Sequence, residues 1–203
     1  MEFKEGTSVY SSDDKNAGNI HQVVIDPETQ SVTHVIILHG LIFKDDKVIP
    51  VENVVSASQE RVDLNLRLEE IKTMSPLDVK KYSSLSDASG SAQSFSPSMG
   101  GLYSNPGPQP YVVTETTRTI PDELVVLKEG ARVISSDEEH VGNVERVYTD
   151  SESGKVTRFI VSQGLLLRTK KAVPIEMVDQ IEDDEVYLSV GAQQLAELPE
   201  VES

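Results

Sequence analysis

The sequence predicts an all-β protein that contains two small β-barrels, joined by a long linker rich in Ser, Gly and Pro. The first observation is a repeat: residues 1–66 align on residues 125–190 at a constant offset of 124, without a gap, and about 23 of the 66 positions are identical. The second is the short-range alternation of apolar and polar residues between turn residues, which is typical of half-buried strands. The third is that residues 86–110 are almost uncharged, as flexible linkers often are.

Each copy should form about six short strands. Val62, Leu64 and Leu66 alternate with polar residues, as a half-buried strand requires. Pro50 fits an edge or a bulge, because proline cannot donate to a sheet ladder. Six strands in ~66 residues bury little as a flat sheet, so we expect the sheet to close into a small barrel. In chain order the expected strands of the first copy are TSVYS, GNIHQVVID, VTHVIILH, KVIPVENV, VVSAS and RVDLNL.

The stretch SSDDKNAGNI, residues 11–20, could be a calcium loop or a turn. An EF-hand loop needs Gly at its sixth position and Glu at its twelfth. With Asp14 as the first position, Gly18 is fifth and Ile25 is twelfth. The second copy, SSDEEHVGNV, keeps Gly142 but changes the potential ligands. We therefore predict a hairpin turn in which Gly18 adopts a special backbone conformation.

Two other connections have readable signals. Residues 26–31, DPETQS, should form a turn, because Pro27 presets φ and the Asp26 side chain can bond backbone amides. The second copy has DSESGK there, where Gly154 supplies positive φ. YVVTETTRTI, residues 111–120, alternates enough to form an added strand.

A short helix should follow each barrel and cover one of its ends. Leu68, Ile71 and Met74 have helical spacing, and Pro76 ends the pattern. Leu195 stands opposite Ile71 in the second copy, so the tail should form the same helix. The expected domains are barrel 1 (1–75), flexible linker (76–124), barrel 2 (125–198) and tail (199–203).

Composition excludes several classes of function. The net charge of −16 disfavours a direct nucleic-acid partner, because phosphate backbones repel an acidic surface. The only basic candidate is RTKK, residues 168–171, for which a solvated loop is the favoured interpretation. The chain has no cysteine for disulfides or thiolate metal sites, an acidic start without a signal-peptide core, and no apolar run near the ~18 residues of a membrane span. A cytoplasmic protein is expected.

The repeat also tests for inherited chemistry, because a site that came with the domain should occur twice. No histidine recurs, and no glycine-rich phosphate loop is present. We therefore expect no catalytic residue, no cofactor, no metal ligand and no enzyme activity, although a site used by one copy alone stays open. The histidines and their counterparts are His21 with Glu145, His34 with Arg158, His39 with Gln163, and His140 with Asn16.

Both copies follow the order Gly-x-x-Val-x-Ser-Ser-Asp, then Gly-Asn and an Asp turn, then a β-branched strand ending in Gly-Leu, then an apolar residue followed by Pro-[Val/Ile]-Glu, and finally Val-x-Leu. This pattern resembles the PRC-barrel family, which includes the H subunit of photosynthetic reaction centres and a ribosomal small-subunit maturation factor. The resemblance implies a small β-barrel used for protein–protein contacts, with no common catalytic residue. The chain lacks the membrane helix of the one and the partner domain of the other, so it implies neither specific role.

Two repeated apolar segments are the candidate interface. Each lies between a strand-ending glycine and a charged turn, where it either plugs the barrel end or receives a partner. We expect an interaction or assembly module that binds a protein partner, self-associates, or both; a ribosome- or RNA-maturation role is the alternative that the family implies. The candidate interface residues are Leu41, Ile42, Phe43, Leu165, Leu166 and Leu167.

Overall fold

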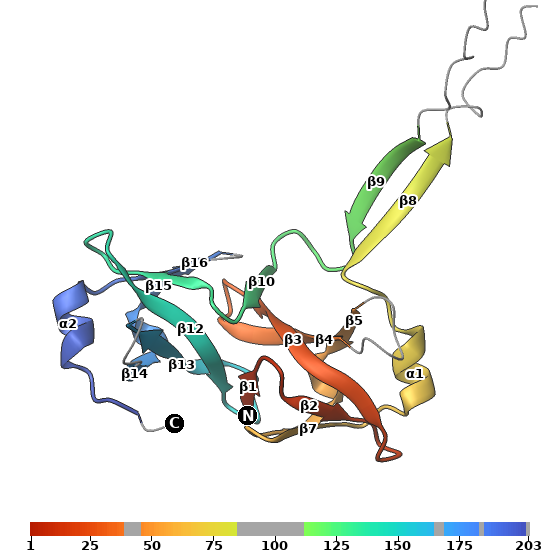
Figure 1. Cartoon of the computed structure of the whole chain (residues 1–203), viewed down its shortest axis with the longest axis horizontal. Coiled ribbons are helices and arrows are strands. Elements are labelled where there is room, and N and C mark those ends of the chain that lie inside the picture. Colours follow the sequence, from red (N-terminus) through yellow and green to blue (C-terminus); the bar gives the residue numbers. More distant parts are fainter. Residues whose placement is uncertain (39–45, 85–111, 165–168, 183–184, 202–203) are drawn as a thin grey trace, which may run out of the picture. The chain divides into compact units, whose positions relative to one another are not determined.

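The chain forms two compact units, which we call the body and the hairpin. The body consists of a first half, Met1–Leu77, and a second half, Thr119–Ser203, and the hairpin is Asp78–Arg118. Figure 1 shows the computed structural model of the chain. It describes residues 1–38, 46–84, 112–164, 169–182 and 185–201.

The two halves contain the same elements in the same order. The elements of the first half are β1 (Glu2–Lys4), β2 (Ser8–Tyr10), β3 (Asn16–Asp26), β4 (Ser31–Leu38), β5 (Lys47–Pro50), the 3₁₀ turn η1 (Val51–Asn53), β6 (Val54–Ala57), β7 (Arg61–Leu64) and α1 (Leu68–Thr73). Those of the second half are β10 (Val125–Lys128), β11 (Arg132–Ile134), β12 (His140–Thr149), β13 (Val156–Gln163), β14 (Thr169–Pro174), η3 (Ile175–Met177), β15 (Val178–Ile181), β16 (Glu185–Leu188) and α2 (Ala192–Glu197).

The sheets of the two halves have one strand order. In the first half it is β5-β4-β3-β2-β7-β6, and in the second it is β14-β13-β12-β11-β16-β15. All neighbours are antiparallel except the pairs β2–β7 and β11–β16, which are parallel. The mainly β fold and its two equivalent sheets, predicted from the repeat, are confirmed.

Chain geometry explains why each sheet must curl. β5 and β6 lie at opposite ends of the strand path, yet only Val51–Asn53 separates them along the chain. Four peptide units span at most about 14 Å, whereas five strand spacings in a flat sheet take about 24 Å. The sheet therefore bends round until its two ends approach each other. Pro50 lies at the end of β5, an end strand of the path, as its missing N–H predicts.

The first strand of each half pairs with the sheet of the other half. β1 pairs with β12, so that Phe3 lies opposite Val147. β10 pairs with β3, so that Leu127 lies opposite Val23. Because Phe3 and Leu127 are equivalent positions of the repeat, the exchange is reciprocal and has local two-fold symmetry. Two barrels closed within residues 1–75 and 125–198 were expected; instead, each sheet is completed by a strand from outside its own range.

A second reciprocal contact joins the turns after β3 and β12. Val32 N–H donates to Gly154 O at 3.1 Å, and Val156 N–H donates to Gln30 O at 2.7 Å. Gly154 has φ +69°, as the sequence predicted, and its counterpart Gln30 adopts φ +54°. Asp26 also behaves as expected, since its Oδ1 accepts bonds from the N–H groups of Glu28 and Thr29 at 2.9 and 3.2 Å. The turns therefore help to hold the halves together.

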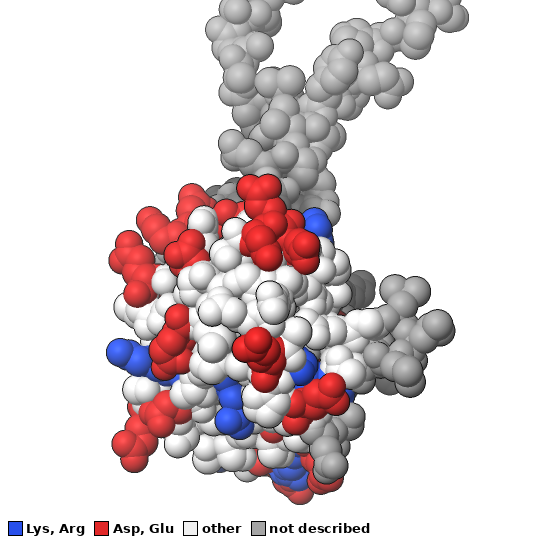
Figure 2. Space-filling model, turned by 90° about the vertical axis from the view of Figure 1, so that its left-hand side faces the viewer, with Lys and Arg blue, Asp and Glu red and all other residues white. Residues whose placement is uncertain are grey.

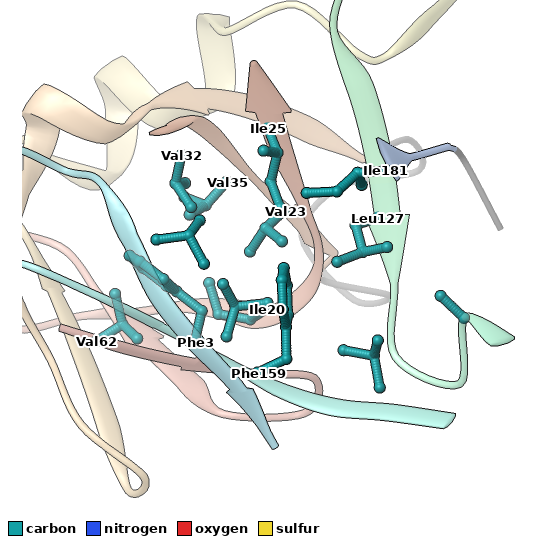
Figure 3. Close-up of a cluster of buried hydrophobic side chains, with 14 of the residues drawn as sticks. Phe3, Ile20, Val23, Ile25, Val32, Val35, Val62, Leu127, Phe159 and Ile181 are labelled. Atoms are coloured by element: carbon teal, nitrogen blue, oxygen red, sulfur yellow. The ribbon is translucent and has the colours of Figure 1, made fainter. Parts of the chain in front are cut away.

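One apolar cluster runs through both halves. Phe3 and Leu127 are 2% and 1% exposed within it, together with residues of both sheets. Figure 3 shows Phe3 and Ile20 of the first half in the same interior as Leu127, Phe159 and Ile181 of the second. Burial of a side chain such as Phe or Leu is worth about 1.5–3 kcal/mol. Because the two halves share this cluster, the body should unfold as one cooperative unit.

The hairpin consists of β8 (Asp78–Ser84) and β9 (Val112–Arg118), which are antiparallel, with Asp78 opposite Arg118. β9 confirms the added strand expected within residues 111–120. Both strands, like residues 119–124 of the body, lie in the range expected to be linker. The flexibility predicted for residues 86–110 concerns a segment outside the described residues and stays a prediction.

Candidate functional site

The predicted apolar interface cannot be placed. Leu41, Ile42 and Phe43, with Leu165, Leu166 and Leu167, lie outside the described residues. The strands that lead to them can be compared. Leu38, at the end of β4, is 43% exposed, whereas its counterpart in β13 is Ser162.

The first half exposes a second large apolar side chain. Val55 of β6 is 64% exposed, and its counterpart in β15 is Asp179. β6 is an end strand of the sheet path. Leu38 and Val55 were not among the predicted interface residues, although both align with a polar residue of the second copy. Exposed apolar side chains mark an interface where they belong to a contiguous apolar patch.

The repeated Ser-Ser-Asp segment has a structural role. Ser11 N–H donates to Lys15 O at 3.0 Å, which closes the predicted turn, and the Ser11 hydroxyl donates to Asp13 Oδ1 at 2.8 Å. Asp13 then accepts a bond of 3.1 Å from Leu68 N–H at the start of α1. Lys15, whose Nζ lies 2.8 Å from Asp13 Oδ2, lowers the pKa of Asp13 most, and the bonds from Ser11 and Leu68 lower it further, so that it lies well below its usual range.

The second copy repeats this arrangement. Asp137 accepts a bond of 3.1 Å from Ala192 N–H at the start of α2, and the Ser135 hydroxyl donates to Asp137. The bond from Ser135 lowers the pKa of Asp137, and the bond from Ala192 lowers it further. The segment that resembled a calcium loop thus satisfies free amides at a helix start.

Two equivalent lysines hold the other ends of these helices. Lys47 Nζ donates to Met74 O at 2.8 Å, just after α1. Lys171 Nζ donates to Ala196 O at 3.0 Å and to Leu198 O at 2.5 Å, at the end of α2. Free carbonyls at a helix end favour such cations. Lys47 and Lys171 occupy the same position of the repeat, so the sequence marked this lysine as a shared feature of the two copies. It did not indicate that the lysine contacts carbonyl groups at the end of a helix.

The basic segment RTKK is therefore not an open cationic patch where it is described. Lys171 is only 7% exposed and is engaged by α2. Lys170 Nζ lies 2.8 Å from Glu145 Oε1, in an ion pair with side chains 15% and 12% exposed. The Glu145 pKa falls below its usual value: burial alone would raise it, but Lys170 and Arg146 outweigh burial. Two of the three cations are thus committed within the fold, and Arg168 lies outside the described residues.

A small pocket lies on the seam between the halves. Its lining includes Glu5 and His21 from the first half with Glu129, Glu145 and Arg146 from the second. Partial burial raises the pKa of Glu129, and the negative charge of Glu5 raises it further. The carboxylates would favour a cationic group, but no group of three or more His, Cys, Asp or Glu residues with metal-binding geometry occurs in the described part of the chain.

The described histidines have local roles. His21 Nδ1 lies 3.3 Å from Glu5 Oε1 on this seam, with both side chains partly exposed. His34 Nδ1 lies 3.0 Å from the Thr33 hydroxyl, and burial lowers the His34 pKa. His140 is exposed at the start of β12. These contacts bring no two histidines together, and His39 is outside the described residues.

The charge is unevenly divided between the units. Within residues 78–118 three Lys and Arg balance three Asp and Glu, so the whole net charge of −16 lies on the body. Figure 2 shows a face of the molecule with many acidic side chains around an uncharged area and fewer basic ones. In the described ranges, no helix has both the length and the apolar character needed to cross a membrane.

Comparisons with known proteins agree with part of the predicted identity. Residues 5–69 match the model of the PRC-barrel domain family. Residues 127–196 match a different family, described as "Uncharacterized protein conserved in bacteria (DUF2171)". A search of the curated proteins found no match. A PRC-barrel match is thus given for the first half, and the second half has the same strand order under another family description.

Proposed function

We propose that the chain is a non-catalytic protein-interaction module built from two copies of one PRC-type barrel, and that its first half receives the protein partner. The observation that carries this proposal is a difference between the halves at two equivalent positions of the repeat. Leu38 and Val55 are exposed on the first half, where the second half has Ser162 and Asp179. Both side chains belong to strands of the domain that matches the PRC-barrel family.

The charge of the body suggests the chemistry of the partner. An acidic surface attracts basic surfaces and repels acidic ones at long range. The partner would therefore present an apolar patch with a basic surround, and the apolar contact would supply most of the affinity. Leu41, Ile42 and Phe43 follow Leu38 closely in the chain and extend the proposed contact in sequence.

The test exchanges residues between the copies. Leu38→Ser with Val55→Asp gives the first half the residues that the second half already has at equivalent positions, so the fold should tolerate them. We expect the variant to keep its circular-dichroism spectrum and melting temperature, but to lose the proteins captured by the wild-type chain from native cells and identified by mass spectrometry. Asp179→Asn is the matched control, because it changes an exposed residue at the same strand position of the other half.

A second variant tests the predicted apolar segments. Phe43→Asp with Leu166→Asp should abolish partner capture, or reduce the mass seen by light scattering if the partner is another copy. Unchanged mass and unchanged partners in both folded variants would place the interface elsewhere. Loss of the fold in the second variant alone would show that these segments plug the barrel ends.

A further inference from the structure

The two exchanged strands are equivalent in backbone pairing but not in the side chains on the outer sheet surface. Val126 is the counterpart of Glu2, and Gln22 is the counterpart of Arg146. β1 and β10 each contact the long strand of the opposite half in the same register. The outer side chains can therefore distinguish pairings that the backbone alone would accept.

The β1–β12 pairing is ionic on this surface. Glu2 lies opposite Tyr148, and Arg146 Nη1 lies 3.2 Å from Glu2 Oε1. Arg146 Nη2 also lies 3.2 Å from Glu145 Oε1. The Arg146 and Glu2 side chains are 6% and 12% exposed, so both charges are largely removed from water.

The β10–β3 pairing is apolar at the same place. Val126 lies opposite Val24 and is 3% exposed. Two residues that flank the hairpin pack in the same cluster as Val126: Leu77, at the end of the first half, and Ile120, near the start of the second half. The cluster consists of Val24, Ile36, Val48, Leu77, Ile120 and Val126.

We propose that the Glu2–Arg146 ion pair and the Val126 cluster form a pairing code, which allows the first half to exchange strands with the second half but not with another first half. The partner that each seam fits is the opposite half of this chain. The code follows from what each wrong pairing would bury.

A pairing between two first halves would place Glu2 against Val24, within the apolar cluster and without Arg146. A pairing between two second halves would place Val126 against Tyr148 and leave Arg146 without Glu2. Removal of one partner from a buried ion pair is strongly unfavourable, whereas replacement of both by apolar residues is often tolerated. The first–first pairing, which buries Glu2 without a cation, should therefore be disfavoured at least about a hundredfold. The second–second pairing should be disfavoured less, because Arg146 keeps its contact with Glu145. The same reasoning disfavours a pairing of β1 with β3 of the same half, because Glu2 would again lie against Val24 and without Arg146.

The experiment starts from the full chain with a protease site placed within residues 85–111. The cleaved protein is unfolded in guanidinium, refolded by dilution, and analysed by native mass spectrometry, which separates first–second, first–first and second–second complexes by mass. For the wild-type seam we expect first–second complexes in at least about a hundredfold excess over first–first complexes, and in a smaller excess over second–second complexes. Without a code, a mixture near 1:2:1 is expected by statistics.

Two variants change the code in different directions. Glu2→Val with Arg146→Gln gives the β1–β12 pairing the residues that the β10–β3 pairing has at the same places, Val126 and Gln22, and should move the mixture toward 1:2:1. Val126→Glu makes β10 resemble β1, and should raise second–second complexes above their wild-type level. The matched control is Arg132→Gln with Glu185→Val, which removes an ion pair of 2.8 Å within the second half and should leave the pairing unchanged.

Like pairs in the wild-type mixture at statistical frequency would overturn the proposal. So would strict first–second pairing in the Glu2→Val, Arg146→Gln variant. Failure of the cleaved wild-type halves to reassociate at all would also refute it, because the seam would then not recognise its partner. A shift of equal size in the Arg132 and Glu185 control would show that lost stability, not the code, changes the mixture.

Discussion

The two halves of the body have the same backbone plan but different surfaces. The residues that close turns and hold helices recur: Asp13 and Asp137 at the helix starts, Lys47 and Lys171 at the helix ends. The residues on the outer sheet surface do not recur, since the β10–β3 pairing is apolar where the β1–β12 pairing is ionic. Repeated residues therefore build the fold, and residues that differ determine what each half pairs with.

The largest expected effect concerns the shared core. Phe3→Ala should reduce the free energy of unfolding by about 3–5 kcal/mol, and Leu127→Ala by about 2–5 kcal/mol, because each removes a fully buried side chain. Both should shift one common urea transition, followed by circular dichroism, since the cluster spans the two halves. Val55→Ala, at an exposed site, is the control. Separate transitions, of which only one moves, would show that the halves unfold independently.

A second comparison separates steric contact from backbone strain. A Cβ on Gly142 would lie 2.6 Å from Ser162 O and 2.7 Å from Val161 Cγ1, and φ is +153°. A Cβ on Gly130 would meet nothing within 4 Å, although φ is +87°. We expect Gly142→Ala to cost about 3 kcal/mol or more, from overpacking and strain together, and Gly130→Ala about 1 kcal/mol, from strain alone. Equal losses in thermal unfolding would contradict this contrast.

The lysines at the helix ends offer a smaller contrast. Lys171→Met should lower the free energy of unfolding by about 2 kcal/mol, because the carbonyl oxygens of Ala196 and Leu198 lose their donor. Lys47→Met should also lower the free energy of unfolding, by about 1 kcal/mol or more, because Met74 O at the end of α1 loses its donor. Hydrogen exchange should report the loss mainly in the helix concerned. Faster exchange spread evenly over the body would argue against local clamping.

The smallest effect should appear in the turns that join the halves. Gln30→Gly should stabilise the body by about 0.5–1 kcal/mol, because φ is +54° there and glycine relieves the strain. Gly154→Ala, at the equivalent position with φ +69°, should destabilise it by about 1 kcal/mol. Opposite signs in paired melting curves are the expected result. A destabilised Gln30→Gly protein would mean that the Gln30 side chain matters more than its backbone.

The candidate sites were predicted only in part from the sequence, as the turn residues show. A turn was predicted over residues 11–20; residues 11–15 form it, whereas Gly18 lies within β3, opposite Val9 and with φ +119°. The contact of Asp13 with α1 was not foreseen, because 55 residues separate Asp13 from Leu68. Leu38 and Val55 were missed because alternation predicts which residues face the core without showing which outer residues stay uncovered. Whether an outer residue is buried depends on its tertiary neighbours, as the packing of Leu77 and Ile120 in the cluster of Val126 shows.

The sequence by itself determined the β class, the repeat and the strands of each half, because alternation, turn residues and helical spacing are local properties. Only the tertiary structure decided which sheet each first strand completes. β1 and β10 occupy equivalent positions of the repeat and pair in the same register, so their place in the repeat does not say which sheet each one completes. The choice depends on contacts between distant residues, such as Glu2 with Arg146 and Val126 with Val24, which no local pattern contains.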